Sequence, residues 1–233
     1  MRPACLLVAL LSLGLVGPAT AQNVVVTGQT VVQHVKPGGD SVGVAVWLVP
    51  LDPTLPLNAQ GKRFQLAQKD KRFEPHVLIV PVGAMVGFPN RDPFFHNVFS
   101  LYDGKRFDLG LYEAGSSRSV QFNRAGVSYI FCNIHPQMSA IVISVNTPFY
   151  AITGKDGRFS FADVPPGRYQ LKVWYERALP EKLVGLAREV IVSARQRDLG
   201  EVSVPEEASL PAPHKNKYDR EYDNTSSPYG PVR

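Results

Sequence analysis

The chain has 233 residues, a formal net charge of +5 and 19% charged residues. Its basic residues are scattered in short pairs without interleaved aromatic residues, which argues against nucleic acid as a partner. Its two cysteines, Cys5 and Cys132, are too few for a zinc ribbon or a cysteine-ligated iron–sulfur cluster.

The first 21 residues have the pattern of a cleaved signal peptide. Arg2 supplies a positive charge, residues 6–16 form an apolar run, and Ala19-Thr20-Ala21 gives a small-x-small cleavage site. The run is shorter than the roughly 20 apolar residues of a membrane-spanning helix. We therefore expect export to the periplasm and a mature chain with no membrane span. Cleavage removes Cys5, so the remaining cysteine is unpaired.

Hydrophobic alternation with period two dominates the rest of the chain. Val42, Val44, Val46 and Leu48 share one face of a predicted strand. Short β-type runs separated by glycine and proline turns continue to residue 204. They cover residues 77–80, 86–88, 98–101, 120–122, 129–131, 141–145, 150–152, 158–161, 169–174, 189–192 and 201–204. This pattern predicts an all-β protein of sandwich type.

The composition changes at Pro205. Residues 205–233 are rich in proline and charge and contain almost no aliphatic side chains, so they cannot bury a core of their own. We interpret them as a disordered or surface-clinging tail.

The segment Phe131–Met138, FCNIHPQM, carries the candidate chemistry. It places Cys132, His135 and Met138 at the spacing C-x2-H-x2-M, directly after a predicted strand. His96, upstream at the start of another strand, would complete a His2Cys site with a weak axial methionine. Thiolate and thioether suit Cu(I), imidazoles also suit Cu(II), and methionine is not a usual zinc ligand. The set therefore predicts one copper ion per chain.

Each of these residues also has an ordinary structural explanation. A lone cysteine is often a small buried hydrophobe, a methionine fills core space, and a histidine is more often a surface residue than a ligand. Their combination in one short loop favours the metal site.

The segments VLIVPVGAMVGFPNRDPFFHNVFS and CNIHPQM resemble cupredoxins of the plastocyanin and amicyanin type, over about residues 64–146. The whole chain is similar to exported methylamine-utilisation proteins, which combine a cupredoxin with a carboxypeptidase-regulatory-like segment, here YAITGKDGRFSFADVPPGRYQLKVW. The resemblance implies a Greek-key β-sandwich. It makes His96 and His135 the imidazole ligands, Cys132 the thiolate and Met138 the axial thioether. It also implies that Asn97, beside the first ligand, hydrogen-bonds across to the ligand loop.

The regulatory-like segment begins in mid-pattern, and VVVTGQTVVQHVKPGGDSVGVAVWLVP near the N-terminus resembles its missing opening strands. We therefore expect residues 22–55 and 147–204 to fold together as one carboxypeptidase-regulatory-like sandwich, of the transthyretin or carbohydrate-binding-like type. A cupredoxin domain at residues 62–146 would be inserted between them. The alternative is a tandem in which the N-terminal strands complete the cupredoxin sheets.

The ligand set and the resemblance together imply a monomeric, non-enzymatic electron carrier that docks with an unidentified redox partner protein. Two other functions remain open. One is a periplasmic copper chaperone or sensor, which the small number of methionines in the mature chain, Met85 and Met138, disfavours. The other is an envelope carbohydrate-binding module with a vestigial cupredoxin, which the complete ligand set disfavours.

Overall fold

The computed structural model describes residues 22–33, 43–52, 63–101, 104–207 and 215–222. The predicted signal peptide, residues 1–21, lies outside the described residues. The described elements are strands apart from one short helix, α1 (Pro180–Gly185), so the expected all-β class is confirmed. Within these ranges no helix has both the length and the apolar character needed to cross a membrane.

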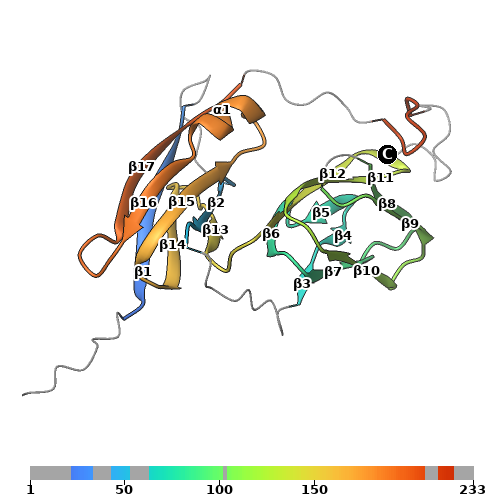
Figure 1. The fold of residues 1–233 in the computed structure, drawn as a ribbon. Helices are drawn as coiled ribbons and strands as arrows, with labels where there is room; N and C mark the ends of the chain where they lie inside the picture. The colour runs from blue at the N-terminus through green and yellow to red at the C-terminus, as the bar shows by residue number, and fades with distance from the viewer. Residues whose placement is uncertain (1–21, 34–42, 53–62, 102–103, 208–214, 223–233) are drawn as a thin grey trace, which may run out of the picture.

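Residues 64–145 form a β-sandwich, here called the central sandwich (Figure 1). Its larger sheet has the order β6-β12-β11-β8-β9, and its smaller sheet has the order β10-β7-β3. The strands of the larger sheet are β6 (Val77–Pro81), β8 (His96–Ser100), β9 (Phe107–Tyr112), β11 (Gly126–Cys132) and β12 (His135–Val145). The smaller sheet consists of β3 (Phe64–Gln65), β7 (Ala84–Pro89) and β10 (Ser117–Phe122), beside a hairpin of β4 (Ala67–Lys69) and β5 (Arg72–Glu74).

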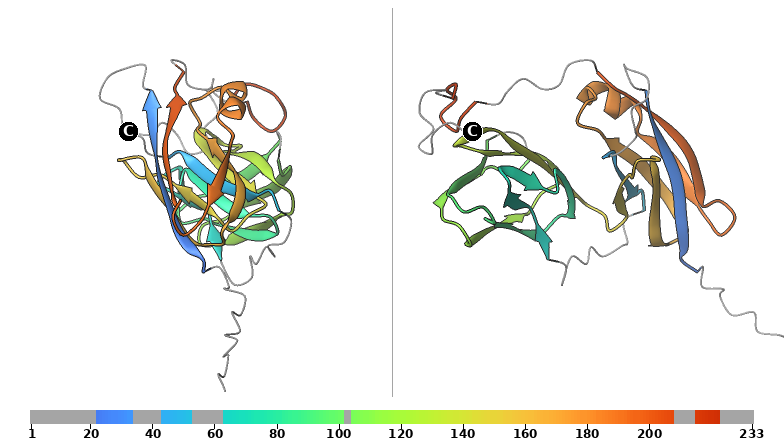
Figure 2. Two further views of the ribbon diagram at one scale, coloured as in Figure 1. Left: turned by 60° about the vertical axis from the view of Figure 1, so that its left-hand side comes forward. Right: turned by 180° about the vertical axis from the view of Figure 1, so that it is seen from behind.

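A second β-sandwich, here called the flanking sandwich, combines strands from both ends of the chain (Figures 1 and 2). One sheet has the order β14-β1-β17, with β1 (Val24–Gln33), β14 (Arg158–Val164) and β17 (Asp198–Pro205). The other has the order β13-β2-β15-β16, with β2 (Ala45–Pro50), β13 (Tyr150–Ile152), β15 (Gly167–Trp174) and β16 (Arg188–Val192). Val44 and Val46 are fully buried in the cluster that contains Phe159, Phe161 and Leu171.

Residues 140–145 of strand β12 are buried on both faces, which explains the mostly hydrophobic sequence of that part of the strand. Met138, Ala140 and Val142 belong to the core of the central sandwich. Ile141 and Ile143, on the opposite face, belong to the core cluster of the flanking sandwich. Because successive side chains of a strand alternate in direction, β12 anchors the metal-site loop at its start and packs the two sandwiches together along its length.

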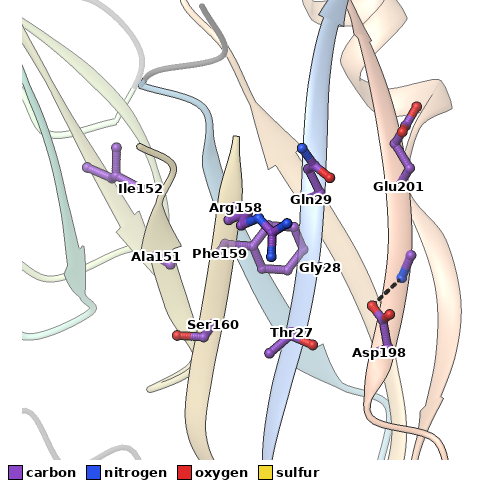
Figure 3. Close-up of a pocket in the computed structure, with 11 residues that line it drawn as sticks. Thr27, Gly28, Gln29, Ala151, Ile152, Arg158, Phe159, Ser160, Asp198 and Glu201 are labelled. Atoms are coloured by element: carbon purple, nitrogen blue, oxygen red, sulfur yellow. Dashed lines mark hydrogen bonds between the residues drawn. The ribbon is translucent and has the colours of Figure 1, made fainter. Parts of the chain in front are cut away.

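The flanking sandwich carries a cavity of about 690 Å³, lined by side chains of β1, β13, β14 and β17 (Figure 3). In Figure 3 the ring of Phe159 lies beside Gly28, and a Cβ atom at that position would overlap the ring tip. The close approach of the ring therefore requires a glycine in the middle of β1. The cavity contains none of the site residues that the sequence predicts.

Part of the C-terminal tail lies against the central sandwich. Residues 215–222, drawn in red in Figure 1, pass beside the ends of β8 and β11, and the Tyr222 hydroxyl donates a hydrogen bond to the Cys132 carbonyl oxygen at 2.9 Å. Residues 208–214 and 223–233 lie outside the described residues. Residues 215–222 contact the central sandwich through polar groups of Lys217 and Tyr222.

Candidate metal centre

The β11–β12 hairpin explains the spacing of the first two candidate ligands. Cys132 ends β11, His135 begins β12, and the turn between them contains only Asn133 and Ile134. A two-residue turn makes its flanking residues direct cross-strand partners, and Cys132 and His135 are paired in this way. The C-x2-H spacing therefore brings a thiol and an imidazole together through local structure alone.

A shift in the strand register of the same hairpin allows Met138, the third candidate, to face the core as well. In a regular strand, residues three positions apart point to opposite faces. The register shifts beside Cys132: Phe131 pairs with Ser139, whereas Cys132 pairs with His135. Met138 is 1% exposed and lies in the same core cluster as Cys132.

His96 reaches the cluster through long-range strand pairing. Cys132 is paired with Val98 of β8, and His96 lies two positions before Val98 on the same face of the sheet. Its Nδ1 atom is 3.5 Å from Cys132 Sγ and 3.2 Å from His135 Nδ1, and His135 Nδ1 is 3.4 Å from Cys132 Sγ. A point equidistant from these three atoms is about 1.9 Å from each, close to metal–nitrogen and metal–sulfur bond lengths of about 2.0–2.3 Å.

Asp92 fixes the orientation of His96. Both residues are almost completely buried, and Asp92 Oδ2 accepts a hydrogen bond from His96 Nε2 at 2.8 Å. The carboxylate itself accepts the backbone N–H groups of Asp70, at 2.6 Å, and Lys71, at 3.0 Å. A proton held on Nε2 leaves the lone pair of Nδ1 facing Cys132 and His135. The three donor atoms therefore form an electron-rich triangle that suits a cation.

The donor set is two imidazole nitrogens and one sulfur in an almost trigonal arrangement, with a buried thioether in the same core cluster. The cluster resembles a type 1 copper site. Zinc sites use cysteine, histidine and carboxylates, and the only carboxylate in direct contact among the described residues, Asp92, bonds to the far nitrogen of His96. The residues present therefore fit one copper ion.

The site favours neutral imidazoles before any metal binds. Burial and the positive charges of His96 and Lys71 lower the pKa of His135 to about 4. Burial also lowers the pKa of His96, although the hydrogen bond that His96 donates to Asp92 opposes this effect. Burial raises the pKa of the Cys132 thiol, against the backbone N–H groups of Ile134, Asn97 and His135 that hydrogen-bond its sulfur. At neutral pH both imidazoles are neutral, so metal binding displaces a proton only from the thiol.

Phe94 covers one side of the cluster. Its ring centroid lies 5.3 Å from that of His96 and 5.6 Å from that of His135, and the Lys71 ammonium is 5.5 Å from the same centroid. His135 is partly exposed, and Pro136 beside it is exposed. The partly exposed His135 therefore adjoins Phe94 and exposed Pro136, two apolar residues that are here called the apolar rim.

Asn97 contacts the ligand loop through its backbone. Its carbonyl oxygen accepts the N–H of Asn133 at 2.9 Å, and its own N–H hydrogen-bonds to the Cys132 sulfur. The Asn97 side chain points elsewhere, because Asn97 Nδ2 donates to Asp108 Oδ1 at 2.7 Å. The expectation of a link between Asn97 and the loop thus corresponds to a backbone link, with the amide side chain directed at β9.

Comparison with known proteins gives matches of low similarity. No family model matches the chain, and no curated protein matches it. A solved purple cupredoxin from Nitrosopumilus maritimus is 24% identical over 36% of this chain and 98% of its own, with a TM-score of 0.32. A P94F variant of amicyanin in the reduced state is 22% identical over 42% of this chain and 99% of its own, with a TM-score of 0.33. A copper-containing nitrite reductase from Thermus scotoductus SA-01 is 24% identical over 51% of this chain and 28% of its own, with a TM-score of 0.35.

The structure brings His96, Cys132 and His135 together as the sequence predicts and places Met138 in the adjoining core. Sequence reasoning gave no role to Asp92, although it lies within the quoted FPNRD motif four residues before His96. An acidic residue that close to a candidate ligand is the signal that could have identified it.

Proposed function

We propose that the protein is a periplasmic electron-transfer protein with one type 1 copper ion held by His96, Cys132, His135 and Met138. One observation carries this proposal: two imidazole Nδ1 atoms and a thiol sulfur lie within 3.2–3.5 Å of one another, and both His96 and Cys132 are fully buried. When bound, copper supplies a one-electron couple.

The chain itself contributes a rigid, water-poor ligand set. Asp92 holds the tautomer and ring angle of His96, the two-residue turn fixes Cys132 against His135, and the backbone N–H groups around Cys132 stabilise negative charge on its sulfur. Because both oxidation states are then met by the same arrangement of donors, little movement accompanies electron transfer.

The test is metal loading of the purified protein, followed by visible spectroscopy. We expect one Cu(II) per chain and an intense thiolate-to-copper charge-transfer band, because the soft sulfur is a direct ligand. Cys132→Ser should abolish the band, and Met85→Leu, at an exposed methionine, is the matched control that should retain it. A protein that purifies with zinc and develops no colour with Cu(II) would refute the proposal.

We place the path of electron exchange at His135, supported by its partial exposure beside exposed Pro136. Transient redox complexes use small interfaces, so one charge in the apolar rim should disturb docking strongly. We expect Pro136→Asp to slow electron self-exchange and to leave the visible spectrum unchanged. The same substitution at exposed Gln137 is the control, and equal rates in both variants would place the exit elsewhere.

We also propose that the central sandwich is a cupredoxin Greek-key domain, inserted into a carboxypeptidase-regulatory-like sandwich of residues 22–55 and 147–204. The pairing of β1 with β14 and β17, and of β2 with β13 and β15, supports this division. Export rests on the signal-peptide pattern of residues 1–21. Cell fractionation followed by N-terminal sequencing tests export. We expect a periplasmic chain that begins at Gln22, and a cytoplasmic chain that retains residue 1 would contradict export.

A further inference from the structure

The tail segment 215–222, here called the C-terminal strap, contacts the start of the ligand loop at two points. The Tyr222 hydroxyl donates to the Cys132 carbonyl oxygen, and the Lys217 backbone N–H donates to Asn133 Oδ1, both at 2.9 Å. Cys132 is the candidate thiolate ligand, and Asn133 is the first turn residue after it. The strap therefore bonds to the part of the loop that determines where the thiol lies.

Lys217 closes a ring of hydrogen bonds around this part of the loop. Its Nζ atom lies 2.8 Å from Asp108 Oδ2, while Asp108 Oδ1 accepts Asn97 Nδ2 at 2.7 Å. The Asn97 carbonyl oxygen in turn accepts the N–H of Asn133, the residue that Lys217 also contacts. The ring links the strap to the residue after Cys132 and to the residue after His96. The side chain of Lys217 is only 20% exposed, unlike that of a lysine in a solvated tail.

The strap has a structure of its own that presents Lys217. Asn216 Oδ1 accepts the backbone N–H groups of Tyr218, at 2.9 Å, and Arg220, at 3.1 Å. The Asn216 backbone N–H donates to the Arg220 carbonyl oxygen at 2.9 Å, and Lys215 pairs with Asp219 at 3.3 Å. This is a closed, self-bonded turn, so fewer degrees of freedom are lost when it docks than for an extended tail.

We propose that the C-terminal strap clamps the ligand loop in its metal-binding conformation, with Lys217 and Tyr222 as positioning residues. The inference rests on the proposed function for its consequence, metal retention, but the docking itself involves only residues of this chain. Clamping the Cys132 side of the loop leaves the His135 side as the accessible one. Loss of either contact should loosen Cys132 and Asn133 together, because the two residues are adjacent in the chain and Asn97 hydrogen-bonds to both, to the Cys132 sulfur through its N–H and to the Asn133 N–H through its carbonyl oxygen.

The test uses the full-length chain with Tyr222→Phe and Lys217→Met. The controls are Tyr150→Phe, in β13 of the flanking sandwich, and Lys155→Met, at an exposed turn residue before β14. In the metal-free protein, NMR measures amide exchange at Asn133 and the 13C shift of the Cys132 carbonyl. Losing one net hydrogen bond of about 0.5–1.5 kcal/mol should speed exchange about 2- to 10-fold. Tyr222→Phe should also move the carbonyl shift upfield, which a purely global loss of stability would not do.

In the copper-loaded protein, we expect both variants to release copper to a chelator about 2- to 10-fold faster than the controls, by the same free energy. If exchange, carbonyl shift and release match the controls, the strap does not clamp the loop. If the wild-type protein binds no copper, the proposed function fails, while the metal-free measurements still decide whether the strap docks as described.

Discussion

Asp92→Asn is the change that tests the site most directly, because one carboxylate accepts hydrogen bonds from three different residues. Asp92 is 5% exposed and accepts hydrogen bonds from His96 Nε2 and from the N–H groups of Asp70 and Lys71. An amide of the same shape has one acceptor oxygen and an NH2 group that cannot accept. At least one of the three donors must therefore lose its partner in a buried site.

The expected magnitude follows from the charge of the acceptor. Hydrogen bonds to ionised groups contribute about 1.5–3 kcal/mol, so the metal-free protein should lose about that much unfolding free energy. The hydrogen bonds of Lys71, His96 and Asp70 outweigh burial and hold the pKa of Asp92 below its usual value. Its contribution is therefore fully present at pH 7 and is lost only as the pH falls through that lowered pKa. Copper affinity should fall about 10- to 100-fold, because the variant no longer fixes the imidazole.

The assay is urea unfolding of the metal-free protein at pH 7, together with copper competition against a chelator of known affinity. Asp70→Asn is the matched control: the residue is exposed, and its φ of 54° is in the left-handed region that asparagine tolerates. If Asp92→Asn equals this control in both measurements, the carboxylate does not position His96 and the reasoning is refuted.

Two further perturbations follow from the same structure. His135 has a pKa of about 4 in the folded chain against 6.5 unfolded, so the unfolded state binds a proton first as pH falls. The contribution of His135 to the unfolding free energy of the metal-free protein should thus be fully present above pH 6.5. It should decrease by on the order of 1–3 kcal/mol as the pH falls to 4 and change no further below pH 4, as urea titrations will show. Gly28→Ala should destabilise the flanking sandwich by about 1–3 kcal/mol in thermal unfolding, because the new methyl group overlaps the Phe159 ring.

Each has a control within the chain. For the loss of stability in acid, His135→Gln should flatten the pH dependence of the unfolding free energy between pH 6.5 and 4. An unchanged slope would assign the loss of stability to other groups. For the crowded strand, Gly87→Ala in β7 adds a Cβ at ordinary contact distances of 3.7 Å or more. Equal melting temperatures for the two alanine variants would contradict the packing argument.

The sequence could predict the hairpin part of the site because its determinants are local. The C-x2-H spacing and a two-residue turn are sufficient to face Cys132 towards His135. His96 and Cys132 come together through pairing of β8 with β11, which no local pattern specifies; the sequence offered His96 as a candidate at the start of a strand, and the resemblance of HNVFS supported that assignment. Asp92 acts by bonding the turn at Asp70 while it holds His96, a three-way contact that exists only once the sandwich has formed.

The tail shows the limit of composition as a predictor. Residues 205–233 lack the apolar side chains that build a core. Docking of the strap uses hydrogen bonds from Lys217 and Tyr222 and one ion pair to Asp108. Such contacts are specific to geometry, so average hydrophobicity and charge carry no signal for them.

The candidate ligands His96, Cys132 and His135 are held by unequal numbers of hydrogen bonds. This difference affects how electrons and solvent protons reach the candidate metal site. His96 has the Asp92 carboxylate behind it, and Cys132 has three backbone N–H groups on its sulfur and the strap on its carbonyl. His135 has no carboxylate partner among the described residues; it is held by the turn and by packing against Phe94, and it is partly exposed. The ligand best placed for electron exchange is therefore also the one least protected from solvent protons. Acid release of copper should begin with protonation of His135, and because Asp92 retains His96, that imidazole should stay in place until the lower pH at which Asp92 is itself protonated.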